Sequence, residues 1–234
     1  MTLISKVVLH HFPATRSVRA RWALLETLGD NFELKRVELY DGAQYSDDFI
    51  GMNPNHNVPL LEIHWQDGTT QVMLESVAIV EWLADRHPEK RIAPPAEGGR
   101  ERVDYLHMLH FAGTWFDMML WQIRIHEHIL PVSERDPRTV ARYRKKITKE
   151  VEPQLLGRLD RHDYICGEHF TAADIVVGHC VFWAIGYDLC QDDRFATYLQ
   201  RLMQREAMKQ ALDDLATFTI APGSDHKLDM SFTG

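Results

Sequence analysis

Residues 52–62 read MNPNHNVPLLE, and in this stretch a proline stands directly before an apolar run that predicts a strand. Proline has no N–H to donate to a β-ladder, so Pro59 is tolerated only at the first position of a strand, at an edge or at a bulge. A cis Val58–Pro59 bond would turn the N–H and C=O of Val58 outward, where a peptide-like ligand could pair with them as an added strand. A trans proline that begins an edge strand is the alternative, and the spacing alone leaves both open.

The sequence around this stretch predicts an α/β domain. Short β-branched or apolar runs alternate with turns, and two helical segments lie among them, one closed by Gly29 and the other stopped by Pro88. A helix between the first two strands predicts a right-handed parallel crossover, and QDG at residues 66–68 predicts an antiparallel hairpin. In chain order, the predicted elements are strand 6–12, helix 17–29, strand 32–39, a loose segment, strand 58–65, strand 69–74 and helix 75–87.

A segment rich in proline, glycine and charge, HPEKRIAPPAEGGR at residues 87–100, separates this part from the rest of the chain. We therefore expect an N-terminal domain over residues 1–87, a linker over 88–99 and an all-helical domain over 100–234. In the third part, apolar residues recur at the spacing that the buried face of a helix requires. They are Tyr105, Met108, Leu109, Ala112, Phe116 and Met119.

The clearest local signal of the helical part is HFTAADIV at residues 169–176. With Thr171 as N-cap, Asp174 falls at the third helical position and can return a hydrogen bond, while Phe170 and Ile175 can form a hydrophobic staple. We interpret this capping box as a structural device. The final stretch, TIAPGSDHKLDMSFTG, carries no such pattern, and we expect it to be loose.

Composition argues against several classes of protein. The net charge of −8 argues against nucleic acid or an anionic membrane as a partner. No apolar run approaches the roughly 20 residues that span a bilayer, and the first residues lack the long apolar region of a signal peptide, so we expect a cytoplasmic protein. Cys166, Cys180 and Cys190 form no CxxC pair, and their odd number suits a reducing compartment better than a disulfide framework.

A second candidate binding feature is LESVAIVEW, where Ser76 stands at the start of a helix with Glu75 directly before it. A serine N-cap needs no ligand, so a purely structural role is one interpretation. The free N–H groups and partial positive charge of a helix start also suit a carboxylate, and Glu75 could take an ammonium group. Together the two residues could hold both ends of an α-amino acid zwitterion.

The sequence resembles the cytosolic glutathione transferases, and the resemblance covers nearly the whole chain. It is carried by three motifs in this order and at this spacing: NPNHNVPLLE, LESVAIVEWL and YICGEHFTAADI. It implies a thioredoxin-like N-terminal domain that binds glutathione and an all-α C-terminal domain. It also implies a second substrate between the two domains, and a homodimer.

By that resemblance, Val58 pairs with the cysteinyl part of glutathione, Pro59 beside it belongs to the binding site, and Glu75 and Ser76 hold the γ-glutamyl end. Asn57 stands where the family often has a polar side chain that reaches the glycyl carboxylate. His56 departs from the pattern because many members have glycine there, which leaves the shape of this loop open.

The resemblance also places the glutathione sulfur over the start of the first helix, in FPATRSVRARW at residues 12–22. A free thiol has a pKa near 8.5, and lowering it to about 6.5 requires roughly 2.7 kcal/mol of preference for the thiolate. The helix dipole supplies about 0.3–2 kcal/mol, and a hydroxyl donor to the anion adds about 1.5–3 kcal/mol. The two contributions together suffice, and neither does so alone.

Three residues compete as the donor to the sulfur. Thr15 is the first choice, because serine-type relatives often place the hydroxyl four positions before an arginine of the first helix, here Arg19. Ser17 is the second choice and could instead cap the helix, and His11, near the tyrosine of tyrosine-type relatives, is the third. Arg16 is assigned to the glutathione site, where its charge could favour the thiolate.

The sequence therefore predicts a glutathione transferase, with glutathione as co-substrate, that presents the thiolate to an apolar electrophile. Tyr105 and Trp115, together with His11, are assigned to the second-substrate pocket, and no metal is expected because the histidines lack a third ligand at diagnostic spacing. The alternatives are a glutathione-dependent peroxidase or reductase and a non-catalytic relative that binds partners. The lack of cysteine in residues 12–22 weakens a cysteine-type interpretation, and the SSC type of signature of maleylacetoacetate isomerases is absent.

Overall fold

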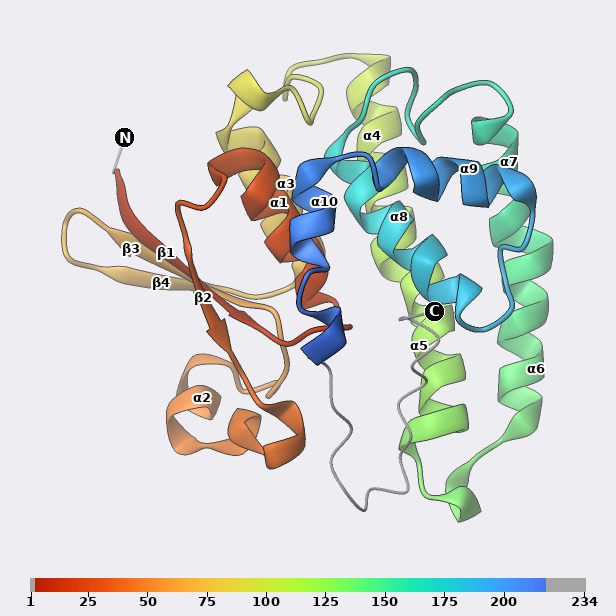
Figure 1. Cartoon of the computed structure of the whole chain (residues 1–234), viewed down its shortest axis with the longest axis horizontal. Coiled ribbons are helices and arrows are strands. Elements are labelled where there is room, and N and C mark those ends of the chain that lie inside the picture. The colour runs from red at the N-terminus through yellow and green to blue at the C-terminus, as the bar shows by residue number, and fades with distance from the viewer. Residues whose placement is uncertain (1–2, 218–234) are drawn as a thin grey trace. The chain divides into compact units, whose positions relative to one another are not determined.

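The structure is a computed structural model that describes residues 3–217, so the stretch 219–234 that we expect to be loose lies outside the described residues. The described residues form two compact units: residues 3–91 with 206–217, and residues 92–205. The first unit is α/β and the second is helical, which confirms the predicted fold class (Figure 1). Residues 206–217, which the sequence analysis assigned to the helical domain, belong to the α/β unit instead.

A four-stranded mixed sheet forms the centre of the first unit, in the order β2-β1-β3-β4. Strands β1 and β2 are parallel, whereas β3 is antiparallel to both β1 and β4, so the predicted crossover and hairpin are confirmed. The elements of this unit are β1 (Ile4–His11), α1 (Ser17–Leu28), β2 (Glu33–Arg36), α2 (Asp47–Met52), β3 (Leu60–Trp65), β4 (Thr70–Met73), α3 (Ser76–Arg86) and α10 (Glu206–Ala211) (Figure 1).

The segment between β2 and β3 is more ordered than the sequence predicts. Strand β2 ends at Arg36, and the loose segment contains two short 3-10 turns and helix α2. The Ser46 hydroxyl caps α2 by accepting the Phe49 N–H at 3.4 Å, and two aspartates in the first turn suit the positive end of the helix dipole. A helix of six residues is too short to give a periodic signal, which is why the sequence did not reveal it.

The second half of β1, residues 7–11, is buried on both faces of the sheet. Successive side chains of a strand point to opposite sides, so neighbouring residues here meet different elements. His10 points toward α2, where its ring meets Phe49 edge-on, and its Nε2 contacts Glu62 Oε1 at 2.5 Å. His11 points to the other side, toward Ser17 at the start of α1. The two adjacent histidines, both 1% exposed, therefore belong to different environments.

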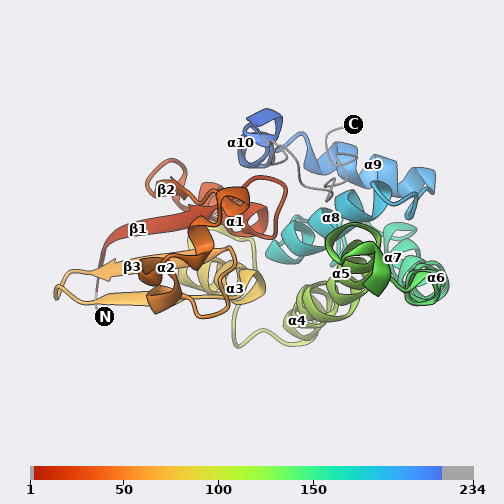
Figure 2. The ribbon, with the colours of Figure 1, turned by 90° about the horizontal axis from the view of Figure 1, so that it is seen from below.

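Ion pairs and hydrogen bonds connect the last described residues to α1 and β2. Arg21 of α1, which is buried, donates to Asp213 Oδ1 at 2.8 Å and pairs with Asp214 Oδ1 at 3.1 Å. Arg36 at the end of β2 donates to the Thr217 hydroxyl at 2.6 Å. These contacts hold the segment that follows α10 beside α1 and β2, which explains why residues 206–217 complete the α/β unit (Figures 1 and 2).

The second unit is helical, and the apolar residues that the sequence singled out in it, from Tyr105 to Met119, are all buried, as predicted. Helix α8 is buried on nearly every side, so it forms the centre of this unit. Three wider π-helical turns, Phe111–Phe116, Ile125–Ile129 and Ile147–Val151, adjoin its other helices. The α-helices are α4 (Arg100–His110), α5 (Asp117–Arg124), α6 (Pro137–Lys146), α7 (Glu152–Leu159), α8 (Ala172–Ile185) and α9 (Asp193–Leu202).

The predicted capping box at the start of α8 is confirmed, and its aspartate does more than cap the helix. Asp174 Oδ2 accepts the N–H and the hydroxyl of Thr171 at 2.8 and 3.0 Å. Its Oδ1 accepts the Ile165 N–H at 2.8 Å and the Tyr198 hydroxyl at 2.9 Å. Complete burial raises the pKa of Asp174, although these hydrogen bonds act against the rise. One carboxylate thus joins the start of α8 to the preceding loop and to α9.

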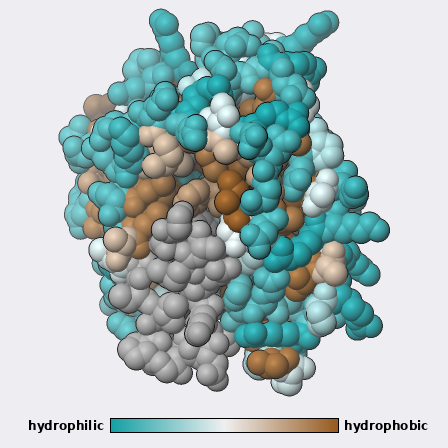
Figure 3. Space-filling model, turned by 45° about the vertical axis from the view of Figure 1, so that its right-hand side comes forward, coloured by the Kyte–Doolittle hydropathy of each residue, from teal (hydrophilic) through white to brown (hydrophobic). Residues whose placement is uncertain are grey.

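The visible surface is mainly polar. On the face drawn in Figure 3 most of the surface is hydrophilic, and hydrophobic side chains show in separate areas. No helix within residues 3–217 is long and apolar enough to cross a membrane.

We expect Asp174→Ala to destabilise the protein by at least about 2 kcal/mol, because it leaves several buried donors without an acceptor, each worth about 1–3 kcal/mol. Thr171→Ala, which removes only the capping hydroxyl, should cost about 1 kcal/mol. Urea unfolding followed by tryptophan fluorescence measures both. Equal losses for the two variants would contradict the role of Asp174 as a junction.

Candidate functional site

The register of the sheet brings the three predicted site segments to one end of the strands. His10 near the end of β1 lies opposite Leu60 at the start of β3, and Leu61 lies opposite Met73 at the end of β4. Three segments therefore lie at the same end of the sheet, where β1 and β4 finish and β3 begins. They are the loop that leads into α1, the Val58–Pro59 stretch and the Glu75–Ser76 pair.

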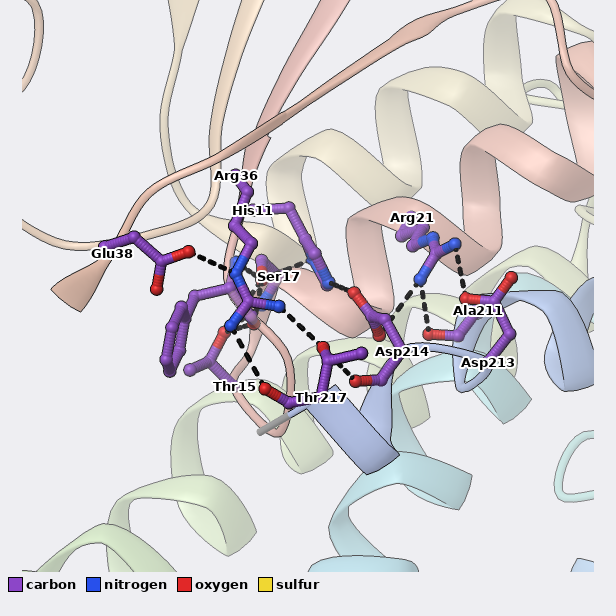
Figure 4. Close-up of polar contacts among 11 residues, drawn as sticks. His11, Thr15, Ser17, Arg21, Arg36, Glu38, Ala211, Asp213, Asp214 and Thr217 are labelled. Atoms are coloured by element: carbon purple, nitrogen blue, oxygen red, sulfur yellow. Dashed lines mark hydrogen bonds and ion pairs between the residues drawn. The ribbon is translucent and has the colours of Figure 1, made fainter. Parts of the chain in front are cut away.

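Two hydroxyls and an imidazole form a continuous chain where β1 passes into α1. Thr15 Oγ1 lies 2.7 Å from Ser17 Oγ, which lies 2.8 Å from His11 Nδ1 (Figure 4). Arg16 occupies the N-cap position without a capping bond from its side chain, so Ser17 does not serve as the helix cap. The Ser17 hydroxyl is completely buried, whereas that of Thr15 belongs to a half-buried residue. The three competing candidates of the sequence analysis are thus one connected group.

The other ring nitrogen of His11 reaches the last described residues. His11 Nε2 lies 3.0 Å from Asp214 Oδ2, a contact that the sequence analysis missed (Figure 4). Burial lowers the pKa of His11, although the bond with Asp214 acts to raise it. Burial acts to raise the pKa of Asp214, but the hydrogen bond from His11 and the charges of His11 and Arg21 outweigh it and leave that pKa below its ordinary value. The imidazole is therefore neutral and the carboxylate ionised near pH 7.

Asn53 shapes the loop that carries the proline motif. Its Nδ2 donates to the Asn57 carbonyl at 2.8 Å and to Asn57 Oδ1 at 3.0 Å, and its Oδ1 accepts the Asn55 N–H at 3.0 Å. His56, in place of the glycine of many family members, adopts φ 43°, a conformation that glycine takes readily. Its ring lies 4.9 Å from that of Tyr45. The substitution therefore keeps the left-handed turn.

The Val58–Pro59 bond is cis, which is one of the two alternatives that the sequence left open. The Val58 side chain is buried, and β3 begins two positions later, at Leu60. Within residues 3–217, none of the backbone hydrogen bonds of loops and turns involves Val58. Its N–H and C=O are therefore suited to pair with an added extended peptide.

The Glu75–Ser76 pair stands at the start of α3, with Glu75 as the N-cap residue. Glu75 adopts φ 68°, which is unfavourable for a residue with a side chain, and such strain is concentrated at functional sites. No side chain caps α3, so Ser76 does not act as an N-cap. Its hydroxyl instead accepts from Arg19 Nη1 at 3.4 Å. The buried Arg19 of α1 thus links the first helix to the predicted zwitterion site.

The residues predicted to line the second-substrate pocket are Tyr105 and Trp115, which lie in the second unit, and His11. Tyr105 is fully buried, with the Arg102 guanidinium 5.1 Å from its ring centre, whereas Trp115 is 40% exposed. Their part in a second-substrate pocket stays a prediction, as does that of His11. Within residues 3–217 no group of three or more His, Cys, Asp or Glu side chains is placed to hold a metal ion.

Comparison with known proteins agrees with this architecture. Residues 5–85 match the family model "Glutathione S-transferase, N-terminal domain". Glutathione S-transferase GstA of Escherichia coli O157:H7 is 27% identical over 211 residues, which cover 87% of this chain and 96% of that protein. Disulfide-bond oxidoreductase YfcG of Escherichia coli (strain K12) is 27% identical over 195 residues, which cover 80% of this chain and 86% of that protein.

Among solved structures, a sphingomonad glutathione S-transferase complexed with glutathione superimposes with a TM-score of 0.71 and 27% identity, over 88% of this chain and 97% of that one. The fold, a thioredoxin-like unit followed in the chain by an all-helical unit, is thus that of the glutathione transferases. Residues 5–85 carry a glutathione S-transferase N-terminal domain, and most of the chain is similar to glutathione S-transferases.

We expect His56→Gly to leave the free energy of unfolding within about 1 kcal/mol of the original, because glycine adopts the left-handed conformation freely but loses more entropy on folding. His56→Val should cost about 1–2 kcal/mol, because a branched side chain is crowded there. Urea unfolding compares the two variants. A valine variant as stable as the glycine variant would show that this conformation does not limit the choice of residue.

Proposed function

We propose that the protein is a glutathione transferase of the serine/threonine type. It binds glutathione in its thioredoxin-like unit, ionises the thiol at the start of α1 and presents the thiolate to an apolar electrophile. The Val58 backbone pairs with the cysteinyl residue, and Glu75 and Ser76 hold the γ-glutamyl end. Asn57 reaches the glycyl carboxylate, and Arg16 adds positive potential. We further propose that the protein acts as a homodimer.

The observation that carries this proposal is the hydroxyl pair at the amino end of α1, in the same unit as the cis-proline loop and the Glu75–Ser76 pair. A thiolate at that point receives both the helix dipole and a hydroxyl donor. Of the two hydroxyls, that of Thr15 is on the more exposed residue, which favours it as the direct partner of the sulfur.

Glutathione-dependent reduction of a disulfide or peroxide is the second candidate, favoured by the similarity to the oxidoreductase YfcG. The cysteines of the chain are poorly suited to such chemistry, because burial raises the pKa of Cys166 to about 12 and also raises that of Cys190. The reacting sulfur in this case is again that of glutathione, so both candidates use the same site. A panel of electrophiles, disulfides and hydroperoxides separates them.

We expect Glu75→Ala to abolish retention on immobilised glutathione, because it removes the partner of the γ-glutamyl ammonium group. Glu75→Gln, which keeps the size of the side chain, should lose most of the retention if the charge is what binds. Circular dichroism controls for folding. Undiminished retention of a folded Glu75→Ala variant would refute the zwitterion clamp.

We expect Thr15→Ala to lower kcat about ten- to a hundredfold, as the loss of one hydrogen bond to an anion predicts, with little change in the affinity for glutathione. Thr15→Ser keeps the donor and should retain most of the activity. Steady-state kinetics with a general aromatic electrophile measures both. Full activity in Thr15→Ala combined with inactivity in Ser17→Ala would transfer the direct contact to Ser17.

A further inference from the structure

Four side chains from two segments far apart in the sequence form a single file of hydrogen bonds at the start of α1. In order they are Asp214, His11, Ser17 and Thr15, with successive distances of 3.0, 2.8 and 2.7 Å between their polar atoms (Figure 4). The half-buried Thr15 stands at one end of the file, and the buried His11 lies behind the two hydroxyls. The file thus leads from the proposed position of the sulfur to a carboxylate.

We propose that Asp214 and His11 form a proton-accepting pair that takes the proton of the glutathione thiol through the hydroxyls of Ser17 and Thr15. This inference rests on the proposed function, because it needs a thiol at Thr15. The pair acts through the hydroxyls, so its two members are positioning residues for the ionisation.

Hydrogen-bond chemistry sets the direction of the file. An ionised carboxylate only accepts, so His11 Nε2 carries a hydrogen toward Asp214 and Nδ1 offers a lone pair. The Ser17 hydroxyl then donates to Nδ1, and its oxygen can accept from the Thr15 hydroxyl, whose hydrogen is otherwise directed to the Phe12 carbonyl at 2.7 Å. If Ser17 donated only to the Phe12 carbonyl, 2.9 Å away, the buried Nδ1 would lose this donor.

In this arrangement Thr15 Oγ1 can also accept a proton. A hydroxyl oxygen has two lone pairs, and the Ser17 N–H, at 3.3 Å, uses one of them. A thiol at the other lone pair gives its proton to Thr15, while Thr15 passes its own proton to Ser17 and Ser17 passes its own to His11 Nδ1. The S–H bond breaks, the N–H bond forms, and the products are a thiolate and an imidazolium.

The same shift leaves every hydroxyl turned toward the sulfur. Thr15 then donates to the thiolate, Ser17 donates to Thr15, and the imidazolium donates to Ser17. When the thiolate adds to a substrate the proton can return along the file to the product, and when it displaces a leaving group the proton passes to solvent.

The charges around His11 suit this role. Asp214 faces its ring from the carboxyl-terminal segment, and Arg21 acts on it from α1. Arg36, opposite His11 in the β1–β2 register, is directed to Glu38 and Thr217. Burial together with the Arg21 charge keeps the free imidazole neutral and able to accept, and Asp214 compensates the charge when the proton arrives.

The test is an ultraviolet titration of the thiolate on the enzyme–glutathione complex, because thiolate absorbance reports ionisation independently of turnover. We expect Asp214→Asn to raise the apparent pKa of the bound thiol, so that the thiolate fraction at pH 7 falls about tenfold, because the imidazolium loses its counter-charge. The acid limb of the pH–rate profile should move to higher pH to the same extent. His11→Gln, which keeps a donor for Asp214 but cannot take a proton, should do the same.

Asp213→Asn is the matched control. Asp213 binds Arg21 at 2.8 Å, as Asp214 does at 3.1 Å, but within residues 3–217 no contact joins it to His11. It should leave the thiol pKa unchanged. Glutathione retention should persist in all three variants, because none removes a contact with the γ-glutamyl end.

Nitrogen-15 NMR of the unmodified protein gives a second measurement that does not depend on the folding of a variant. One neutral imidazole should gain a proton when glutathione binds. A lowered thiol pKa that survives in Asp214→Asn and His11→Gln would overturn the relay alone. A bound thiol that titrates like free glutathione in the original protein would overturn the proposed function as well.

Discussion

The pairing of β1 with β3 is the constraint on which the candidate site depends. Because side chains alternate along a strand, a slip of one residue would exchange the faces of His10 and His11. His11 would then face α2 and lose Ser17 and Asp214. The register is held by buried apolar side chains, among them Val7, Leu9 and Ile63. The hydrophobic core therefore decides which of two adjacent histidines stands behind the start of α1.

The charged side chains around His11 can accommodate one more positive charge. Arg21 lies between Asp213 and Asp214, so the three side chains together carry one negative charge in excess. A protonated His11 would neutralise that excess. Buried hydrogen bonds gain strength from the low local dielectric, and an unpaired buried group is correspondingly costly. The neutral imidazole has a hydrogen-bond donor on one side, Ser17, and an acceptor on the other, Asp214. Neither of its ring nitrogens is therefore left unpaired before a ligand binds.

What the sequence predicted correctly is local. The hairpin, the helix closed by Gly29 and the Thr171–Asp174 capping box each depend on residues only a few positions apart. The contact between His11 and Asp214 spans 203 residues, and no periodicity or short motif reports it. The sequence grouped His11, Thr15 and Ser17 as rivals, because residue spacing alone does not tell which side chains turn toward one another, whereas the structure joins them in one chain. Asn53 was missed as well, although an asparagine before a proline is typical of side-chain-stabilised turns.

A helix dipole and a hydroxyl donor stabilise a thiolate, but they do not determine where its proton goes. If the proton passes to solvent, the thiolate fraction below the pKa changes about tenfold for each unit of pH. If it passes to His11, thiol and imidazole exchange one proton inside the protein, and the balance between the two forms is independent of pH until one of them titrates with solvent. A buried base that is neutral when the site is free, and that gains its counter-charge from Asp214, favours the second case. The residues that complete the first unit from the far end of the chain thus bear directly on how the thiol ionises.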